Sequence, residues 1–360
     1  MMGESMAAGK KATIRQVASV AGVSIQTVSR VLNDHPYVAD ETRQRVLAAI
    51  KQLEYRPDAI ARSLINRRSY TLGVVAAEID RYGPQRMLVG IEKQAAALGY
   101  SLLLSVIHHP AADNGARQLD ILLSRQVDGI IWAVPEMDNN QVWFQSKLRQ
   151  LTIPVILVSS GVCNGLPTVL ADNRGGGRLA TEHLLTQGYR QVGLITGPLS
   201  WAAARQRQLG WQDALAVASL PAEDRRTFDG DWSAASGERG LYRLIEQFPE
   251  IDAVFACNDQ MALGVLQAAH LLGRRVPEDL AVVGYDAIPE SAYFWPPLTS
   301  VWQHLIDAGS IAVRELSSLI EVKRKGEERV QPLCVVIQPQ LIVRKSSVAS
   351  ELASTARKAG

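Results

Sequence analysis

Hydrophobic positions follow two different rhythms along this chain of 360 residues. Up to about residue 55 they recur at the three- and four-residue spacing of amphipathic helices. From Thr71 onward, short continuous apolar runs alternate with helical stretches, which is the pattern of buried parallel strands joined by helices. The chain is also long for a single hydrophobic core. The pattern therefore predicts a small helical domain followed by a larger α/β body.

The helical part opens with TIRQVASVAGVSIQTVSRVLN at 13–33, two amphipathic segments joined by a tight turn. Thr13 and Gln16 have the spacing of a capping box, and Ser24 is a good N-cap for the second segment. Gly22 supplies the left-handed backbone that a sharp turn needs. A third helix is expected from Asp40 through Leu53. This is the arrangement of a helix-turn-helix, whose second helix enters the major groove of DNA.

Charge distribution agrees with a DNA-binding N-terminus. Residues 1–68 hold 11 Lys and Arg against 6 Asp and Glu, whereas the rest holds 27 against 30. A basic domain on a mildly acidic body suits phosphate contact by one end only. An ordinary helical bundle would explain the apolar spacing but not the free polar edge of the second helix or its basic surroundings.

The body contains seven predicted strands, and a second cycle of strands and helices starts near Val192. Such a rhythm predicts right-handed βαβ units in two similar lobes, with ligands bound at the carboxyl ends of the strands. The strands are 72–76, 102–106, 129–133, 155–158, 192–196, 253–256 and 281–284; helices are expected at 86–98, 177–187, 207–218 and 261–272.

Residues 13–57 resemble the DNA-binding headpiece of the lactose/galactose-repressor (LacI/GalR) family, which carries the pattern VA..AGVS..TVSRVLN. Four further segments extend the resemblance over the body, and their motifs are closest to the family's lactose-repressor branch. They are GPLSWAAARQRQLGW at 197–211, GDWSAASG at 230–237, ACNDQMALG at 256–264 and VVGYDAIPES at 282–291. The resemblance implies an α/β effector domain like periplasmic binding proteins, with two Rossmann-like lobes and largely parallel sheets.

Rhythm and resemblance together divide the chain into successive parts. We expect a disordered N-terminus at 1–12, the helix-turn-helix domain at 13–57, a hinge helix at 58–69, an effector-binding and dimerisation domain at 70–344, and a flexible tail at 345–360. The first lobe should comprise 70–170 and 303–332, and the second 171–302 and 333–344. The tail lacks leucine heptads, so the resemblance implies a homodimer and not a four-helix tetramer. Residues 86–98 and 233–244 offer candidate dimer surfaces.

On a double-stranded operator, Ile25, Gln26 and Arg30 are expected to contact base edges. In the hinge, Leu64 falls where the family inserts an apolar wedge into the minor groove, although core packing would also explain a leucine there. The remaining residues expected at the DNA are Thr13, Ser24, Thr27, Ser29, Asn33 and Ala61.

A small saccharide is the effector that the resemblance favours. Arg207, Asn258 and Asp286 match residues that hydrogen-bond ligand hydroxyls, Trp232 matches an aromatic face against a sugar ring, and Gln303 matches a crossover residue at the pocket. In the first lobe Arg81 and Ser159 replace a leucine and an aspartate, and Ala77, Ala171 and Leu305 also depart from the lactose-repressor pattern. Planar polar groups beside an indole suit a sugar. Taken singly, Trp232 could instead be core, Asp286 a helix cap, and Arg207 part of a surface ion pair.

Other classes of protein find little support. Glycines 175–177 lack the spacing of a phosphate loop, so close helix packing is the better explanation. Cys163, Cys257 and Cys334 are too scattered for a disulfide framework or a metal site. No catalytic motif is present, so we expect no enzyme and no cofactor. With no apolar run of membrane-span length and no signal-peptide core in residues 1–12, the chain should act in the cytoplasm. The alternatives are a corepressor-dependent regulator that binds a purine or other metabolite and, in another class, a non-regulatory sugar-binding protein.

Overall fold

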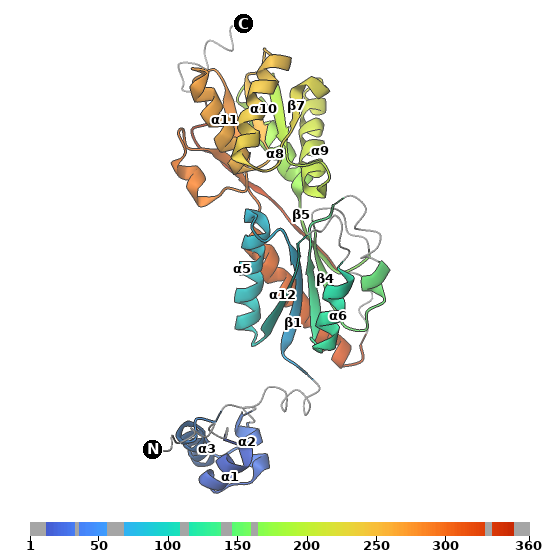
Figure 1. Cartoon of the computed structure of the whole chain (residues 1–360), viewed down its shortest axis with the longest axis vertical. Helices are drawn as coiled ribbons and strands as arrows, with labels where there is room; N and C mark the ends of the chain where they lie inside the picture. The colour runs from blue at the N-terminus through green and yellow to red at the C-terminus, as the bar shows by residue number, and fades with distance from the viewer. Residues whose placement is uncertain are drawn as a thin grey trace, which may run out of the picture. The chain divides into compact units, whose positions relative to one another are not determined.

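The computed structural model describes residues 12–32, 36–55, 68–108, 115–137, 146–159, 165–327 and 333–348. The chain divides into two compact units, residues 1–69 and 70–360. Within the described residues, the first contains three helices, and the second contains two six-stranded sheets with their covering helices (Figure 1). The predicted α/β class with an N-terminal helical domain is confirmed.

The N-terminal unit is built from α1 (Ile14–Ala21), α2 (Ile25–Leu32) and α3 (Asp40–Gln52). Thr13 and Gln16 form the capping box, with the Thr13 N–H 2.8 Å from Gln16 Oε1. Gly22 adopts a φ of 65°, and the Ser24 hydroxyl accepts the Thr27 N–H at 3.1 Å, so turn and second N-cap are as predicted. A small core holds the helices together: Val17, Ala18, Ala21, Val28, Val31, Val46 and Ala49.

The first sheet of the body is entirely parallel and has the order β11-β5-β4-β3-β1-β2. Helices α5 (Tyr82–Ala97), α6 (Ala116–Ser124) and α12 (Leu305–Arg324) pack against it. Its strands are β1 (Thr71–Ala77), β2 (Ser101–Ile107), β3 (Gly129–Ala133), β4 (Val155–Ser159), β5 (Thr168–Ala171) and β11 (Cys334–Ile337).

The second sheet has the order β12-β10-β9-β8-β6-β7 and is parallel except at β12, which runs antiparallel to β10. Helices α8 (Asn173–Thr186), α9 (Ala202–Val217), α10 (Ala234–Gln247) and α11 (Asp259–Leu271) cover it (Figure 1). Its strands are β6 (Val192–Thr196), β7 (Thr227–Asp229), β8 (Ala253–Ala256), β9 (Ala281–Tyr285), β10 (Thr299–Trp302) and β12 (Gln340–Ile342).

All seven predicted strands are present, each within one residue of the expected ends. Predicted helices begin too late: α5 starts at Tyr82 and not at residue 86, because its first turn, with Gly83 and Pro84, has the composition of a loop. The short strands β5, β7, β10, β11 and β12 were not expected. Among the described residues, no helix combines the length and apolar composition needed to cross a bilayer.

Two expected boundaries near the C-terminus are wrong. The chain was expected to pass from the first lobe to the second for the last time between residues 332 and 333. It does so near residue 338, because β11 pairs with β5 in the first sheet (Val335 beside Val169) before β12 joins the second. Residues 334–337 therefore belong to the first lobe. The tail does not begin at 345 either, since the buried Ser346 hydroxyl accepts the Thr299 N–H at 2.8 Å. Cys257 is a buried free thiol, and Cys334 is disulfide-bonded.

Three pairs of helices meet through glycines. A Cβ on any of the six glycines would lie 1.9–2.2 Å from a carbonyl oxygen of the partner helix. Because real Cβ atoms do not approach backbone this closely, only glycine allows these distances. Gly177 belongs to this set, as the sequence suggested. The pairs are Gly90 with Gly309 (α5 and α12), Gly177 with Gly210 (α8 and α9), and Gly237 with Gly264 (α10 and α11).

Substitution of Gly264 tests this packing. A Cβ at Gly264 would meet the Ala234 carbonyl oxygen at 1.9 Å, so Gly264→Ala should force α10 and α11 apart. We expect the free energy of unfolding to fall by roughly 3 kcal/mol, measured by urea denaturation. Gln267→Ala, at an exposed position of the same helix, is the control and should change it by less than about 0.5 kcal/mol. Equal midpoints for both variants would contradict the packing argument.

Candidate functional site

The second helix of the headpiece presents a polar edge. Ser24, Ile25, Gln26 and Arg30 are exposed, with Ile25 43% accessible despite its apolar side chain, whereas Val28 between them is fully buried. Thr27 and Ser29 are half-buried, and Thr13 is exposed at the start of α1. The α2 residues expected to read bases thus share an accessible edge. Asn33, Ala61 and Leu64 lie outside the residues that the structure describes.

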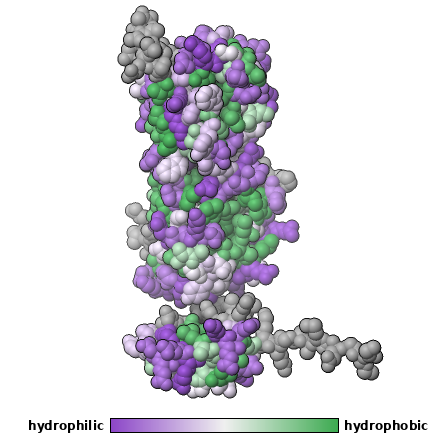
Figure 2. All heavy atoms as spheres, turned by 90° about the vertical axis from the view of Figure 1, so that its left-hand side faces the viewer, coloured by the Kyte–Doolittle hydropathy of each residue, from purple (hydrophilic) through white to green (hydrophobic). Residues whose placement is uncertain are grey.

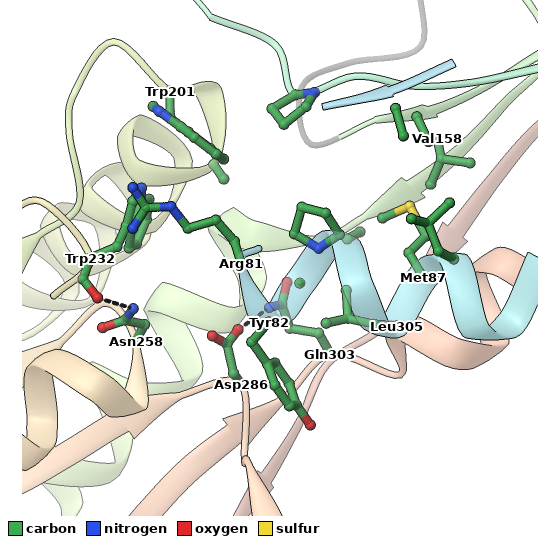
Figure 3. Close-up of a pocket in the computed structure, with 18 of the residues that line it drawn as sticks. Arg81, Tyr82, Met87, Val158, Trp201, Trp232, Asn258, Asp286, Gln303 and Leu305 are labelled. Carbon is green, nitrogen blue, oxygen red and sulfur yellow. Dashed lines mark hydrogen bonds between the residues drawn. The ribbon is translucent and has the colours of Figure 1, made fainter. Parts of the chain in front are cut away.

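A cavity of about 250 Å³ lies between the two lobes of the body (Figure 3). On the second lobe its lining follows the carboxyl ends of successive strands: Trp232 after β7, Asn258 after β8, Asp286 after β9 and Gln303 after β10. Parallel strands bring these chain segments to one edge of the sheet, where α/β folds bind ligands. Six of the seven predicted effector residues line this cavity: Arg81, Arg207, Trp232, Asn258, Asp286 and Gln303. The side chain of Ser159, at the end of β4, lies outside the described structure.

Arg207 is buried, with 6% of its surface exposed, and each of its guanidinium nitrogens has a partner. Nε donates to Asn173 Oδ1 at 2.8 Å, Nη1 donates to the Cys257 carbonyl, and Nη2 lies 3.4 Å from Gln303 Oε1. The guanidinium also stacks 3.7 Å from the centroid of the Tyr285 ring. This environment fixes the cation at the cavity wall, so it is not the surface ion pair that an isolated arginine might form.

Asp286 is the anionic counterpart of Arg207. Its carboxylate accepts a hydrogen bond from Gln303 Nε2, so Gln303 connects the two charged side chains. Burial raises the pKa of the Asp286 carboxyl to about 6, while the nearby Arg207 charge and the Gln303 hydrogen bond oppose the rise. Its backbone has a φ of 103°, and its N–H donates to the Val301 carbonyl, so Asp286 does not cap a helix.

A second carboxyl, Asp259, lies behind the cavity and was not predicted. Its Oδ1 accepts the Ser300 hydroxyl at 2.6 Å and its Oδ2 accepts the Ile288 N–H at 2.8 Å. Ser300 Oγ in turn accepts the Ala287 N–H at 3.0 Å. Burial raises the pKa of Asp259 to about 8, with Asp286 adding to the rise. These bonds fix the left-handed turn that directs Asp286 toward the cavity. The sequence places Asp259 beside Asn258 but cannot show its contacts with residues about 30 and 40 positions later.

Trp232 and Asn258 form the aromatic side of the site. Asn258 caps α11 by accepting the Met261 N–H at 2.8 Å, and its Nδ2 donates to the Trp232 carbonyl at 2.9 Å. The Trp232 ring packs on Gly197, where a Cβ would approach it to 2.1 Å. Trp201 meets Trp232 edge-on with ring centroids 5.8 Å apart (Figure 3). Nε1 of Trp232 is buried without a hydrogen-bond partner.

Arg81 connects the two lobes. It precedes α5 of the first lobe, lies 3.4 Å from Glu78 Oε2, and donates through Nη1 to the Asp231 carbonyl of the second lobe at 3.3 Å. Figure 3 shows its side chain extended toward Trp232. A second contact between the lobes, the hydrogen bond from Ala202 N–H to the Glu136 carbonyl, lies beside Trp201. Both contacts involve cavity-lining residues, so a molecule that enters can influence how the lobes meet.

Several other lining residues were not singled out from the sequence. Trp201 was within a quoted segment, and an aromatic residue shortly after a strand end was the available signal. The sequence contains no signal that would mark Met87 and Leu88 on α5 as lining residues, since apolar positions of a helix usually indicate core. Among the described side chains, no group of three or more His, Cys, Asp and Glu is arranged to hold a metal ion. Planar polar groups beside an indole can hold adjacent hydroxyls together with an apolar ring face.

Comparison with known proteins agrees with both units of the fold. Residues 13–58 match the family of bacterial regulatory proteins named for lacI, and residues 181–347 match the periplasmic binding protein-like domain. The chain is 34% identical over 337 residues to the transcriptional repressor PurR of Mannheimia succiniciproducens, covering 93% of this chain and 98% of that protein. It is 30% identical over 342 residues to the lactose operon repressor of Escherichia coli K12, covering 95% and 94% of the two chains.

A solved structure shows the same architecture. The lac repressor dimer bound to operator and the anti-inducer ONPF superposes with a TM-score of 0.82 at 31% identity, over 94% of this chain and all of that one. The likeness thus includes headpiece and effector domain together. This chain belongs to the lacI family of bacterial regulatory proteins and is a DNA-binding transcriptional repressor of that family.

Proposed function

We propose that this repressor binds a near-palindromic operator as a homodimer and is released when a small saccharide occupies the cavity between its lobes. The observation that carries the effector assignment is the array of Arg207, Gln303 and Asp286 beside Trp232. Vicinal hydroxyls suit such planar donors and acceptors, and the indole suits the apolar face of a sugar ring. We further propose that the cavity performs no chemistry, and that the protein acts in the cytoplasm, where bacterial operators lie.

Release from DNA is proposed to be a shift between two arrangements of the lobes. A ligand shifts such an equilibrium only when it binds one arrangement better than the other. Two hydrogen bonds that join the lobes at the cavity support this proposal. They run from Arg81 to the Asp231 carbonyl and from the Ala202 N–H to the Glu136 carbonyl. A ligand that competes for Arg81 would weaken one of them. The hinge and its wedge Leu64, at residues 58–69, are proposed to transmit the change to the DNA.

Two strongly exposed aromatic residues support the homodimer. Tyr293 and Trp295 are 89% and 91% exposed. Because aromatic side chains are enriched in protein interfaces, two such exposed side chains favour an interface at this segment. Figure 2 shows hydrophobic areas on the face of residues 70–360 that carries α5 and α11. The expected surfaces at 86–98 and 233–244 correspond to α5 and α10, whose buried faces pack on α12 and α11. We therefore add the 293–295 segment to the proposed dimer surface.

The DNA assignment predicts a sequence-specific defect in Gln26→Ala. A glutamine that pairs with one base contributes about 1–3 kcal/mol of discrimination, so the preference for that base should fall roughly 5- to 150-fold. Operators selected from random DNA by the full chain, followed by anisotropy titrations, measure this. Gln52→Ala, also exposed but on α3, is the control and should keep the preference. Uniform weakening on every sequence would instead indicate that Gln26 contacts phosphate.

Effector binding should depend on pH through Asp286. Because burial raises its pKa to about 6, the carboxylate that accepts ligand hydroxyls is ionised at pH 7.5 and protonated at pH 5. If the protonated form does not bind, effector affinity should fall about tenfold between these values. Calorimetry across pH tests this, and Asp286→Asn should bind more weakly with a flatter profile. An unchanged wild-type affinity at pH 5 would remove Asp286 from the binding site.

The dimer surface is tested by Tyr293→Asp. A carboxylate buried at an interface without a partner is costly, so sedimentation at low micromolar concentration should show a dimer for the wild type and a monomer for the variant. Val217→Asp, at another strongly exposed apolar position (82%), should remain dimeric. A wild-type tetramer, or a dimeric Tyr293→Asp protein, would contradict the assignment.

A further inference from the structure

Helix α9 of the second lobe receives its N-terminal cap from the first lobe. The first N–H groups of a helix have no acceptor within the helix, and a Ser, Thr, Asp or Asn side chain commonly supplies one. The N-cap residue of α9 is Trp201, whose indole carries no acceptor and makes no capping hydrogen bond. The first N–H of the helix, that of Ala202, instead donates to the Glu136 carbonyl at 2.8 Å. Moving the lobes apart would therefore leave this helix end without its acceptor.

A second backbone contact lies directly beside this hydrogen bond. Met137 of the first lobe pairs with Trp201 of the second in an antiparallel β-bridge. The bridge and the hydrogen bond together join two short segments, residues 136–137 and residues 201–202. We call this pair of segments the clasp.

The loop that leads into the clasp is fixed within the second lobe. Arg205, one turn into α9, donates through Nη1 to the Leu199 and Ser200 carbonyls at 2.5 and 2.7 Å. The Trp201 N–H donates to the Pro198 carbonyl at 2.9 Å. Because these bonds tie the loop to the helix, a displacement of the Trp201 side chain also moves the backbone of the clasp.

Trp201 is also exposed to whatever occupies the cavity. Its side chain belongs to the lining, and its ring meets the Trp232 ring edge-on (Figure 3). Trp232 has no room to retreat, because its ring packs directly on Gly197. A ligand that presses on this aromatic pair therefore displaces Trp201 and not Trp232.

We propose that Trp201 is the positioning residue through which occupancy of the cavity changes the arrangement of the lobes. In the operator-binding arrangement the clasp is closed, and α9 takes its cap from Glu136. An effector that displaces the Trp201 ring breaks the hydrogen bond from Ala202 to Glu136 and so favours the released arrangement. This inference rests on the proposed release by an effector and adds the contact that carries it.

Ala202→Pro tests the hydrogen bond of the clasp. Proline lacks the N–H but is favoured at the first position of a helix, and the Trp201 angles (φ −84°, ψ 129°) suit a residue before proline, so α9 should still form. Anisotropy titrations use an operator selected from random DNA, with glucose, galactose, mannose and ribose as probes. The sugar that releases the wild type should release this variant at about 2- to 10-fold lower concentration, since one hydrogen bond no longer opposes release.

Ala202→Gly is the matched control. It keeps the N–H that donates to Glu136, so its release midpoint should equal that of the wild type. If Ala202→Pro also keeps the wild-type midpoint, the clasp does not oppose release and the inference is wrong.

A cross-link tests the clasp without any effector. Paired residues of antiparallel strands have Cα atoms about 4.5–5.5 Å apart, a distance that a disulfide spans. Oxidation of the double variant Met137→Cys/Trp201→Cys should hold the clasp closed and leave operator affinity equal to that of the reduced protein. A fall on oxidation within the roughly 5- to 150-fold range of allosteric couplings would overturn the inference. The two single variants, oxidised in the same way, control for the native cysteines.

Replacement of the Trp201 ring separates binding from release. Trp201→Leu keeps the backbone of the clasp but lacks the ring, so calorimetry should still detect sugar binding while the ratio of operator affinities without and with sugar falls toward one. Trp201→Phe keeps an aromatic ring and should restore much of the ratio. A wild-type ratio in Trp201→Leu would contradict the role of the ring. If no saccharide binds the wild type, the saccharide effector is wrong, and the cross-linked protein still decides whether the closed clasp binds operator.

Discussion

A buried guanidinium organises the cavity of this repressor. Removing a charge from water is tolerated only when hydrogen bonds and an opposite charge replace the solvent. Arg207 obtains them from Asn173 at the start of α8, from the Cys257 carbonyl after β8, and from Gln303 in a crossover between the lobes. Gln303 in turn donates a hydrogen bond through Nε2 to the Asp286 carboxylate, which supplies the opposite charge. One cation thus fixes four chain segments around the cavity, and two of them, at Asn173 and Gln303, lie at crossovers between the lobes.

Each lobe is built to be rigid. Glycine contacts lock α5 to α12, α8 to α9 and α10 to α11 at distances that no other residue allows. In contrast, contacts at the cavity between the lobes consist of a few hydrogen bonds, including the long one from Arg81 to the Asp231 carbonyl. Rigid lobes joined by weak contacts can change their mutual arrangement without repacking their cores, which is the kind of two-state element that ligand control requires.

Many strands and several cavity residues could be predicted from the sequence, and the same physical reasons explain the predictions that were wrong or missing. Buried parallel strands appear as continuous apolar runs, so β3, β6 and β8 were predicted to the residue. β11 was placed in the wrong lobe because a four-residue strand can pair with either sheet, and only tertiary contacts decide which. The role of Asp259 was missed because it depends on Ser300 and Ile288, which are distant in sequence. The positions of Trp232, Asn258 and Asp286 at strand ends were predictable because parallel topology gathers the carboxyl ends of strands at one edge of the sheet.

The three alanines at strand ends of the first lobe bear on how such a protein acquires new specificities. Changes at Ala76, Ala133 or Ala171 would alter the space in the cavity without touching the hydrogen bonds of Arg207, Asp286 and Gln303. Evolution or an engineer can therefore retune recognition in small independent steps while the buried charge network stays intact. Gene regulation by a new inducer would then require a handful of substitutions in one lobe and no redesign of the switch.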